Sequence, residues 1–172
     1  MLRLIAFQIG NNISYSELAS NLKVNTRTVQ RYLNILEKVY ILFSLSGYSR
    51  NLRKEYAKTP RYYFYDNGIR NAVISNFNRL NLRDDIGKLW KNYIISERIK
   101  KNHYYNIHTN QFFWRTYDQQ EIDYVEEREG NLFGFEIKWN LKKHKVPKIF
   151  LETYKNSKWT LINKENYLDF IC

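Results

Sequence analysis

Residues 121–139, EIDYVEEREGNLFGFEIKW, place apolar and polar side chains in alternation on either side of one short glycine-containing turn. Such alternation is typical of strands with one buried face, because strand side chains repeat every two residues. The EREGN segment predicts a tight turn centred on either Glu129-Gly130 or Gly130-Asn131. The preceding QFFWRTY segment has the composition of a further strand. We therefore expect three successive antiparallel strands in this part of the chain.

Both turn positions predict that Asp123, Glu136 and Lys138 share one face of the sheet, because a shift between them changes only which residue lies opposite Asp123. The first turn pairs Asp123 with Glu136 and the second pairs it with Lys138. Glu121 shares the same face. A strand face that carries Glu and Lys is ordinarily solvated, and this is the simplest interpretation.

The alternative interpretation is a metal-dependent phosphodiesterase site. Carboxylates that converge beside one lysine repel each other and are costly to bury. A divalent cation removes that objection, and carboxylate oxygens suit Mg²⁺ or Mn²⁺. In such a site Asp123 and Glu136 would be metal ligands, and Lys138 would position the attacking water or stabilise developing negative charge.

Residues 84–102, DDIGKLWKNYIISERIKKN, predict a helix that begins at Asp84 or Asp85 and ends near two lysines, as the helix dipole prefers. Glu97 continues the apolar stripe of this helix. A carboxylate that faces a core needs a partner, so Glu97 is a candidate further metal ligand. The alternative is a side chain tilted toward solvent that pairs with Lys101. The stripe consists of Ile86, Leu89, Trp90, Tyr93 and Ile94.

Residues 14–38 contain two helix starts separated by a short polar turn. Ser14 and Glu17 have the spacing of a capping box, and Asn25 is placed to cap the second helix. This organisation predicts a helix-turn-helix. The second helix carries side chains suited to phosphates or base edges in its first turns, and a solvated polar face is the alternative interpretation. These residues are Thr26, Arg27, Thr28, Gln30 and Arg31.

Two segments rich in β-branched and aromatic residues, YILFSLSGYSRN and RYYFYDNG, follow that helix and predict a pair of strands, or wing. The connection between them contains Arg50, Arg53 and Lys54. These residues could lie along a phosphate backbone, and a solvated loop explains them equally well. The chain as a whole has 28 Lys and Arg against 17 Asp and Glu, for a net charge of +11. Such an excess favours DNA or another polyanion as a partner.

Three classes of protein are not expected. No apolar run is long enough for a membrane span, and the N-terminal residues lack the features of a signal peptide, so we expect a cytoplasmic protein without a membrane partner. Cys172 is the only cysteine, which excludes a disulfide framework. The chain lacks the G-x-x-x-x-G-K-[ST] phosphate loop and cannot hydrolyse ATP by that mechanism.

The spacing of EID, twelve further residues and EIK resembles the PD-(D/E)XK nuclease superfamily. The resemblance implies that Asp123 is the acid of the first hairpin strand and that Glu136 and Lys138 form the E-x-K pair. It also implies that Glu97 is the additional acid that many members carry on the preceding helix. Ile122 stands where the superfamily name has proline. Catalysis would then require Mg²⁺ or Mn²⁺.

A longer resemblance runs along nearly the whole chain and includes LRLIAFQIGNNISYSELASNL, TVQRYLNILEKVYILFSL, YFYDNGIRNAVI, LWKNYIISERIK and FEIKW. These segments are similar to the C-terminal region that follows the ATPase module in a family of prokaryotic AAA+ ATPases. The resemblance implies an α+β fold, with a winged helix-turn-helix domain over residues 1–78. It implies an α/β PD-(D/E)XK nuclease-like domain with a mixed sheet over residues 79–172. The ATPase module would be a partner outside these residues.

We therefore expect a DNA-binding protein that has the potential to hydrolyse DNA phosphodiester bonds. The alternative is a noncatalytic module that retains the nuclease fold and binds DNA or another protein. An ion-pair network on the Glu136–Lys138 face would account for the same residues in that case.

Overall fold

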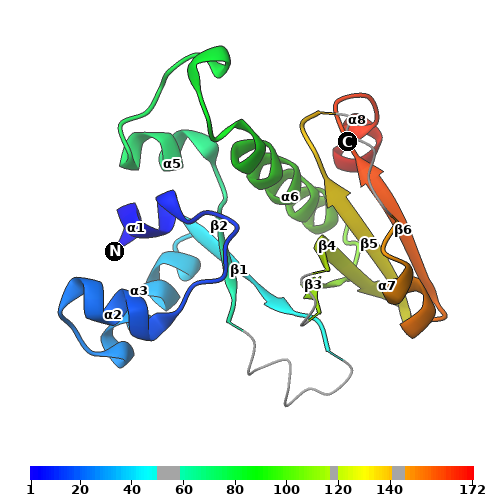
Figure 1. Ribbon diagram of the computed structural model, residues 1–172, viewed down its shortest axis with the longest axis horizontal. Coiled ribbons are helices and arrows are strands. Elements are labelled where there is room, and N and C mark those ends of the chain that lie inside the picture. The colour runs from blue at the N-terminus through cyan, green and yellow to red at the C-terminus, as the bar shows by residue number, and fades with distance from the viewer. Residues whose placement is uncertain (50–58, 117–119, 141–145) are drawn as a thin grey trace. The chain divides into compact units, whose positions relative to one another are not determined.

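The computed structural model describes residues 1–49, 59–116, 120–140 and 146–172. The fold is α+β, and its strands form a mixed sheet in the order β2-β1-β3-β4-β5-β6 (Figure 1). The chain divides into two compact units, Met1–Leu45 with Thr59–Ser96 and Ser46–Lys58 with Glu97–Cys172. Strand β1 (Leu42–Gly47) and helix α6 (Ile86–Tyr104) each contribute residues to both units.

The first unit begins with three helices, α1 (Leu2–Phe7), α2 (Tyr15–Leu22) and α3 (Thr26–Lys38). Helix α2 begins as predicted, because the Ser14 side chain accepts a hydrogen bond from the backbone N–H of Glu17. Asn25 caps α3 in the same way: its Oδ1 atom accepts a hydrogen bond from the backbone N–H of Thr28 at 2.7 Å. The predicted pair of helices is therefore confirmed, whereas α1 was not predicted.

The predicted pair of strands is also present. The first residues of β1 pair antiparallel with β2 (Arg61–Phe64), and Leu42 lies opposite Phe64. The side chain of Asn92 in α6 binds the backbone of Phe64 twice: Oδ1 accepts from its N–H at 2.8 Å and Nδ2 donates to its carbonyl at 2.9 Å. The amide of Asn92 thus satisfies backbone groups of β2 that a neighbouring strand would otherwise satisfy.

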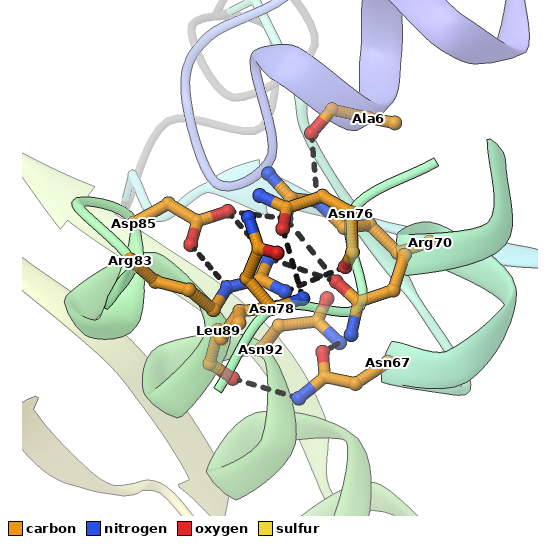
Figure 2. A network of polar contacts seen from close by, with 10 residues as sticks. Ala6, Asn67, Arg70, Asn76, Asn78, Arg83, Asp85, Leu89 and Asn92 are labelled. Carbon is orange, nitrogen blue, oxygen red and sulfur yellow. Dashed lines mark hydrogen bonds and ion pairs between the residues drawn. The ribbon is translucent and has the colours of Figure 1, made fainter. Parts of the chain in front are cut away.

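Asp85 binds two arginines in the first unit (Figure 2). Arg83 donates from Nε to Oδ1 at 2.8 Å and from a terminal nitrogen to Oδ2 at 2.9 Å, while Arg70 donates to Oδ2. Arg70 also donates from Nε to the carbonyl of Ala6 in α1, and Arg83 donates to the carbonyl of Asn76. Because both arginine side chains are 2% exposed, this cluster holds three separate segments of the first unit together.

The described segment between β2 and α6 contains only two short helices. Helix α5 covers Asn67–Val73, with Asp66 as its cap, and ends within the segment IRNAVISNFN. A short 3-10 helix, η1, follows at Leu80–Leu82. Helix α6 begins at Ile86, after Asp85, whose carboxylate binds Arg70 and Arg83.

In the second unit, β3 (Asn110–Arg115), β4 (Glu121–Arg128) and β5 (Asn131–Ile137) are successive antiparallel strands, as predicted. Two parallel pairings extend this meander: the end of β1 pairs with β3, and β6 (Ser157–Ile162) pairs with β5. The sheet is therefore mixed.

Two short helices complete the second unit, α7 (Lys148–Thr153), which was not predicted, and α8 (Tyr167–Ile171). Phe150 of α7 is fully buried and meets the sheet in a hydrophobic cluster. This core contains Tyr48, Trp114, Ile122, Val125, Leu132, Phe150 and Tyr154. None of the helices in the described ranges combines the length and apolar character that a membrane span requires.

Candidate functional site

The β4–β5 hairpin has one of the two registers that the sequence allowed. Arg128 lies opposite Asn131, so Glu129 and Gly130 form the turn. Both turn residues have positive φ, 49° and 75°, which is the conformation of a type I′ hairpin turn and is favourable for glycine. The same register pairs Tyr124 with Phe135 and, continued by one residue, brings Asp123 opposite Glu136.

A β-bulge interrupts β4 at the position of Asp123. Phe112 of β3 pairs with Val125, but Trp114 pairs with Ile122, so one residue of β3 lies opposite two residues of β4. Ile122 and Val125 consequently belong to the same hydrophobic cluster, although a regular two-residue repeat would separate them. The prediction that Asp123, Glu136 and Lys138 share one face assumed a regular two-residue alternation of side chains. The bulge interrupts that alternation in β4 at Asp123.

Asp123 is instead fixed by a hydrogen bond to the neighbouring strand. The Oδ2 atom accepts from the backbone N–H of Ile137 at 3.0 Å, and the residue is fully buried. The bond attaches Asp123 to β5 at the residue between Glu136 and Lys138. The bulge and this bond together bring the carboxylate to the E-x-K segment.

Glu136 and Lys138 form an ion pair, with 2.7 Å between Oε1 and Nζ. The side chain of Glu136 is 10% exposed and that of Lys138 is 34% exposed, so the ammonium group is accessible from solvent while the carboxylate is largely covered. Lys138 follows the last residue of β5, and its backbone N–H donates to the carbonyl of Ile162 in β6. The Glu136–Lys138 pair is thus held by two strands.

Glu97 does not face the core, and that expectation was wrong. Its side chain is 32% exposed and pairs with Lys100 at 2.7 Å, one residue earlier than the alternative partner Lys101. The stripe that led to Glu97 included Tyr93, which is 37% exposed. Within the described ranges no three His, Cys, Asp or Glu side chains gather closely enough to hold a metal ion. Glu97 therefore does not complete a three-carboxylate set with Asp123 and Glu136.

Asp123 and Glu136 nevertheless fit a site for a hard divalent cation. Mg²⁺ is commonly bound through one or two carboxylates, with water and substrate phosphate as its other ligands. Two carboxylates beside one lysine are consistent with this chemistry, and the third acid is not essential to it.

A buried polar network that was not predicted from the sequence lies beside this hairpin. Arg98 binds Glu126 in a bidentate pair, with Nε to Oε1 at 2.8 Å and a terminal nitrogen to Oε2 at 3.0 Å. Asn102 Nδ2 and the hydroxyl of Tyr124 also donate to Oε1 of Glu126, at 2.7 and 3.2 Å. Residue spacing could have indicated this network. Arg98 and Asn102 are four residues apart on one helix, and Tyr124 and Glu126 are two residues apart on one strand, so each pair shares a face.

Glu126 is ionised despite its burial. Desolvation raises the pKa of this carboxyl, but the hydrogen bonds and positive charge of Arg98, together with Asn102, outweigh it, so the pKa lies below its ordinary value. Desolvation and the charge of Glu126 raise the pKa of the Tyr124 hydroxyl well above its ordinary value. Tyr124 is therefore a neutral hydrogen-bond donor. We interpret the network as structural, since Arg98 also donates to the carbonyl of Phe170 in α8.

The residues expected to contact DNA lie mostly on the surface of α3. Thr26, Arg27, Gln30 and Arg31 are exposed. Thr28 is less accessible, and its hydroxyl donates to the side chain of Asn25 at 2.9 Å, so it belongs to the helix cap. The three other expected contacts, Arg50, Arg53 and Lys54, lie outside the described residues.

Comparisons with known proteins give two family matches of unknown function. Residues 1–81 match a domain of unknown function, DUF8612, and residues 86–168 match another, DUF4143. The chain is similar to uncharacterized proteins of Mycobacterium bovis and Mycobacterium tuberculosis, at 28% identity over 140 residues. The aligned part is 78% of this chain and 30% of each relative, so the chain spans less than a third of their length. No solved structure matches it.

Proposed function

We propose that this chain is the DNA-binding, nuclease-like C-terminal part of an AAA+ ATPase-type protein, and that its second unit hydrolyses DNA phosphodiester bonds with Mg²⁺ or Mn²⁺. One observation carries the proposal: the bulged strand β4 attaches Asp123 to the E-x-K segment through Ile137, beside the Glu136–Lys138 pair. The association with an ATPase rests on the resemblance of the sequence. The relatives have enough additional length for such a module.

The residues would divide the chemistry between them. Asp123 and Glu136 would hold the cation, which when bound would neutralise charge on the scissile phosphate and lower the pKa of water. Lys138, which is partly exposed, would approach the phosphate and stabilise the negative charge that develops during attack. Its pairing with Glu136 keeps the ammonium at the end of β5 before substrate binds.

A plasmid-cleavage assay with Mg²⁺ or Mn²⁺ tests this proposal. We expect Lys138→Ala to reduce the cleavage rate about 10²–10³-fold, the effect typical of removing one group that stabilises transition-state charge. Glu136→Ala should be at least as damaging, because it removes a ligand. Glu97→Gln should cleave nearly as well as the wild type, since Glu97 pairs with Lys100 and is not a required ligand.

Lys158→Ala is the matched control, because Lys158 is an exposed lysine on the neighbouring strand β6. Its cleavage rate should equal that of the wild type, and circular dichroism should show all variants folded. Wild-type protein that binds DNA but leaves it intact with either metal would refute hydrolysis. That result would support the alternative, a noncatalytic binding module. The ion pair that already engages Lys138, and the missing third acid among the described residues, favour this alternative.

We propose, as the second part of the function, that α2, α3 and the β1–β2 pair form a winged helix-turn-helix that binds duplex DNA through α3. The capped start of α3 exposes two arginines one helical turn apart, Arg27 and Arg31, with Gln30 between them. Lys38 on the same helix is exposed as well, and it lies two further turns along.

Duplex binding should weaken when Arg27 and Arg31 are both replaced by alanine. If each contacts a phosphate, the plot of log Kd against log salt concentration should lose about two units of slope, because each contact releases about one counterion. Lys23→Ala is the control, as an exposed cation at the end of α2. Equal salt dependence in the double variant and the wild type would exclude α3 as the DNA-contacting helix.

A further inference from the structure

A cavity of about 250 Å³ lies at the C-terminal end of α6, within the second unit. Its walls come from the last turns of the helix and the segment that leads to β3. They carry amide, hydroxyl and imidazole groups from Asn102, His103, Asn106, His108, Thr109 and Gln111. None of these residues belongs to the Asp123–Lys138 site or to α3, so the cavity is a separate feature of the molecule.

Asn102 gives this cavity a buried hydrogen-bond acceptor. The residue is 2% exposed, and its Nδ2 donates to Oε1 of Glu126 at 2.7 Å and toward Oγ1 of Thr109 at 3.4 Å. The carboxylate of Glu126 accepts hydrogen bonds only, so it fixes which end of the amide faces it. The Oδ1 atom of Asn102 is buried and has no hydrogen-bond partner within the part of the chain that the structure describes.

A buried acceptor without a donor costs about 1–3 kcal/mol. The amide nitrogen of Asn102 is already engaged, so the oxygen is the atom that a ligand in the cavity could bind. Such a ligand must supply an N–H or O–H donor. The cavity is smaller than the roughly 300 Å³ at which sites for drug-sized molecules begin, which suits a single planar ring system.

Two exposed aromatic rings lie where the chain leaves the helix. Tyr104 is 78% exposed and Tyr105 is 68% exposed, and they stand in sequence between His103 and Asn106 of the cavity wall. The chain reverses here, because Asn106 adopts a positive φ of 53° and the N–H of Ile107 returns to the carbonyl of Asn102 at 2.8 Å. Exposed aromatic rings on a basic protein are typical platforms for stacking of unpaired bases.

We propose that this end of α6 binds single-stranded nucleic acid. One unpaired base occupies the cavity, where an N–H group of its pairing edge donates to Oδ1 of Asn102. The neighbouring base stacks on Tyr104 or Tyr105. Imidazole rings such as those of His103 and His108 also stack on bases, which explains the composition of the wall. This activity requires neither hydrolysis at Lys138 nor duplex binding by α3.

Fluorescence anisotropy with labelled 12-nucleotide single strands, DNA and RNA, tests the proposal on the full chain with EDTA present, so that cleavage cannot interfere. Stacking contributes about 1–3 kcal/mol per base, and 1.4 kcal/mol corresponds to a tenfold change in Kd. The double substitution Tyr104→Ala, Tyr105→Ala should therefore weaken binding about tenfold or more. Tyr40→Ala is the matched control, because Tyr40 is 73% exposed and lies in the first unit. Its affinity should be that of the wild type.

A second measurement addresses the cavity itself. Mononucleotides added to the wild type should shift the NMR signals of the His103 and His108 rings. Unshifted ring signals at saturating mononucleotide, or equal single-strand affinity in the wild type and the double tyrosine variant, would overturn the proposal. Failure of the α3 proposal is distinguishable, since Arg27→Ala with Arg31→Ala should alter duplex binding and leave single-strand binding intact.

Discussion

Arg98→Met is expected to lower the free energy of unfolding of the second unit by about 3–5 kcal/mol, the cost typical of removing one partner from a buried ion pair. Glu126 would keep its charge in a fully buried site, where Asn102 and Tyr124 remain as close donors and Arg128 remains as a cation 3.5 Å away. The substitution would also remove the hydrogen bond to Phe170 and the contact of the guanidinium with its ring, 4.6 Å away.

Urea unfolding followed by tryptophan fluorescence measures this change, because Trp114, Trp139 and Trp159 all belong to the second unit. Lys100→Met on the same helix is the control: its pair with Glu97 is partly exposed, and such pairs contribute about 0–1 kcal/mol. Adding Glu126→Gln to Arg98→Met should recover part of the loss, because it removes a buried charge that has lost its bidentate partner. An effect of Arg98→Met no larger than that of Lys100→Met would show that the network adds little to stability.

Asp85→Ala is expected to destabilise the first unit by a similar amount, about 3–5 kcal/mol, because it leaves two buried guanidinium groups without their carboxylate. The change would also release α1, since Arg70 connects Asp85 to the carbonyl of Ala6. Amide hydrogen exchange should show the loss of protection in α1 and α5, whereas strands β4 and β5 should change much less.

The same carboxylate gives the first unit an acid-sensitive contribution. Hydrogen bonds from Arg83 lower the pKa of Asp85 to about 2, against the opposing effect of its burial and with further lowering by Arg70. An unfolded aspartate has a pKa of about 3.9. The unfolded chain thus takes up the proton first, so the contribution is complete above about pH 4 and is lost as pH falls toward 2. Asp85→Ala should show a flatter pH dependence over this interval.

Asp84→Ala is the control for both measurements, because Asp84 is adjacent and exposed. It should retain the stability and the acid dependence of the wild type. Equal pH dependence in all three proteins would mean that another group governs acid unfolding.

Local hydrogen-bond chemistry made much of the fold predictable. Ser14 and Asn25 marked the starts of α2 and α3 because cap side chains must satisfy the first N–H groups of a helix. The β4–β5 hairpin followed from alternation around a single glycine. The sequence did not select between two turns, since both Glu129-Gly130 and Gly130-Asn131 contain a residue suited to positive φ.

The sequence predicted which residues form the candidate site better than it predicted their geometry. Glu136 and Lys138 form a pair, as residues two apart in an extended segment can. Asp123 reaches them through a bulge that depends on the pairing of β4 with β3, and no pattern within β4 indicates that bulge. Glu97 was misplaced because a charge was assigned to an apolar stripe, whereas burial on α6 shifts to polar residues that have partners, such as Asn92 and Arg98.

The boundary between the two family matches does not coincide with the end of the first compact unit on helix α6. The two family matches divide at its beginning, between residues 81 and 86, whereas the first compact unit continues to Ser96. Asn92 lies in the segment that matches DUF4143, whereas Phe64, whose backbone it binds, lies in the segment that matches DUF8612. Replacing Asn92 would therefore leave backbone groups of one matched segment without the partners that the other supplies.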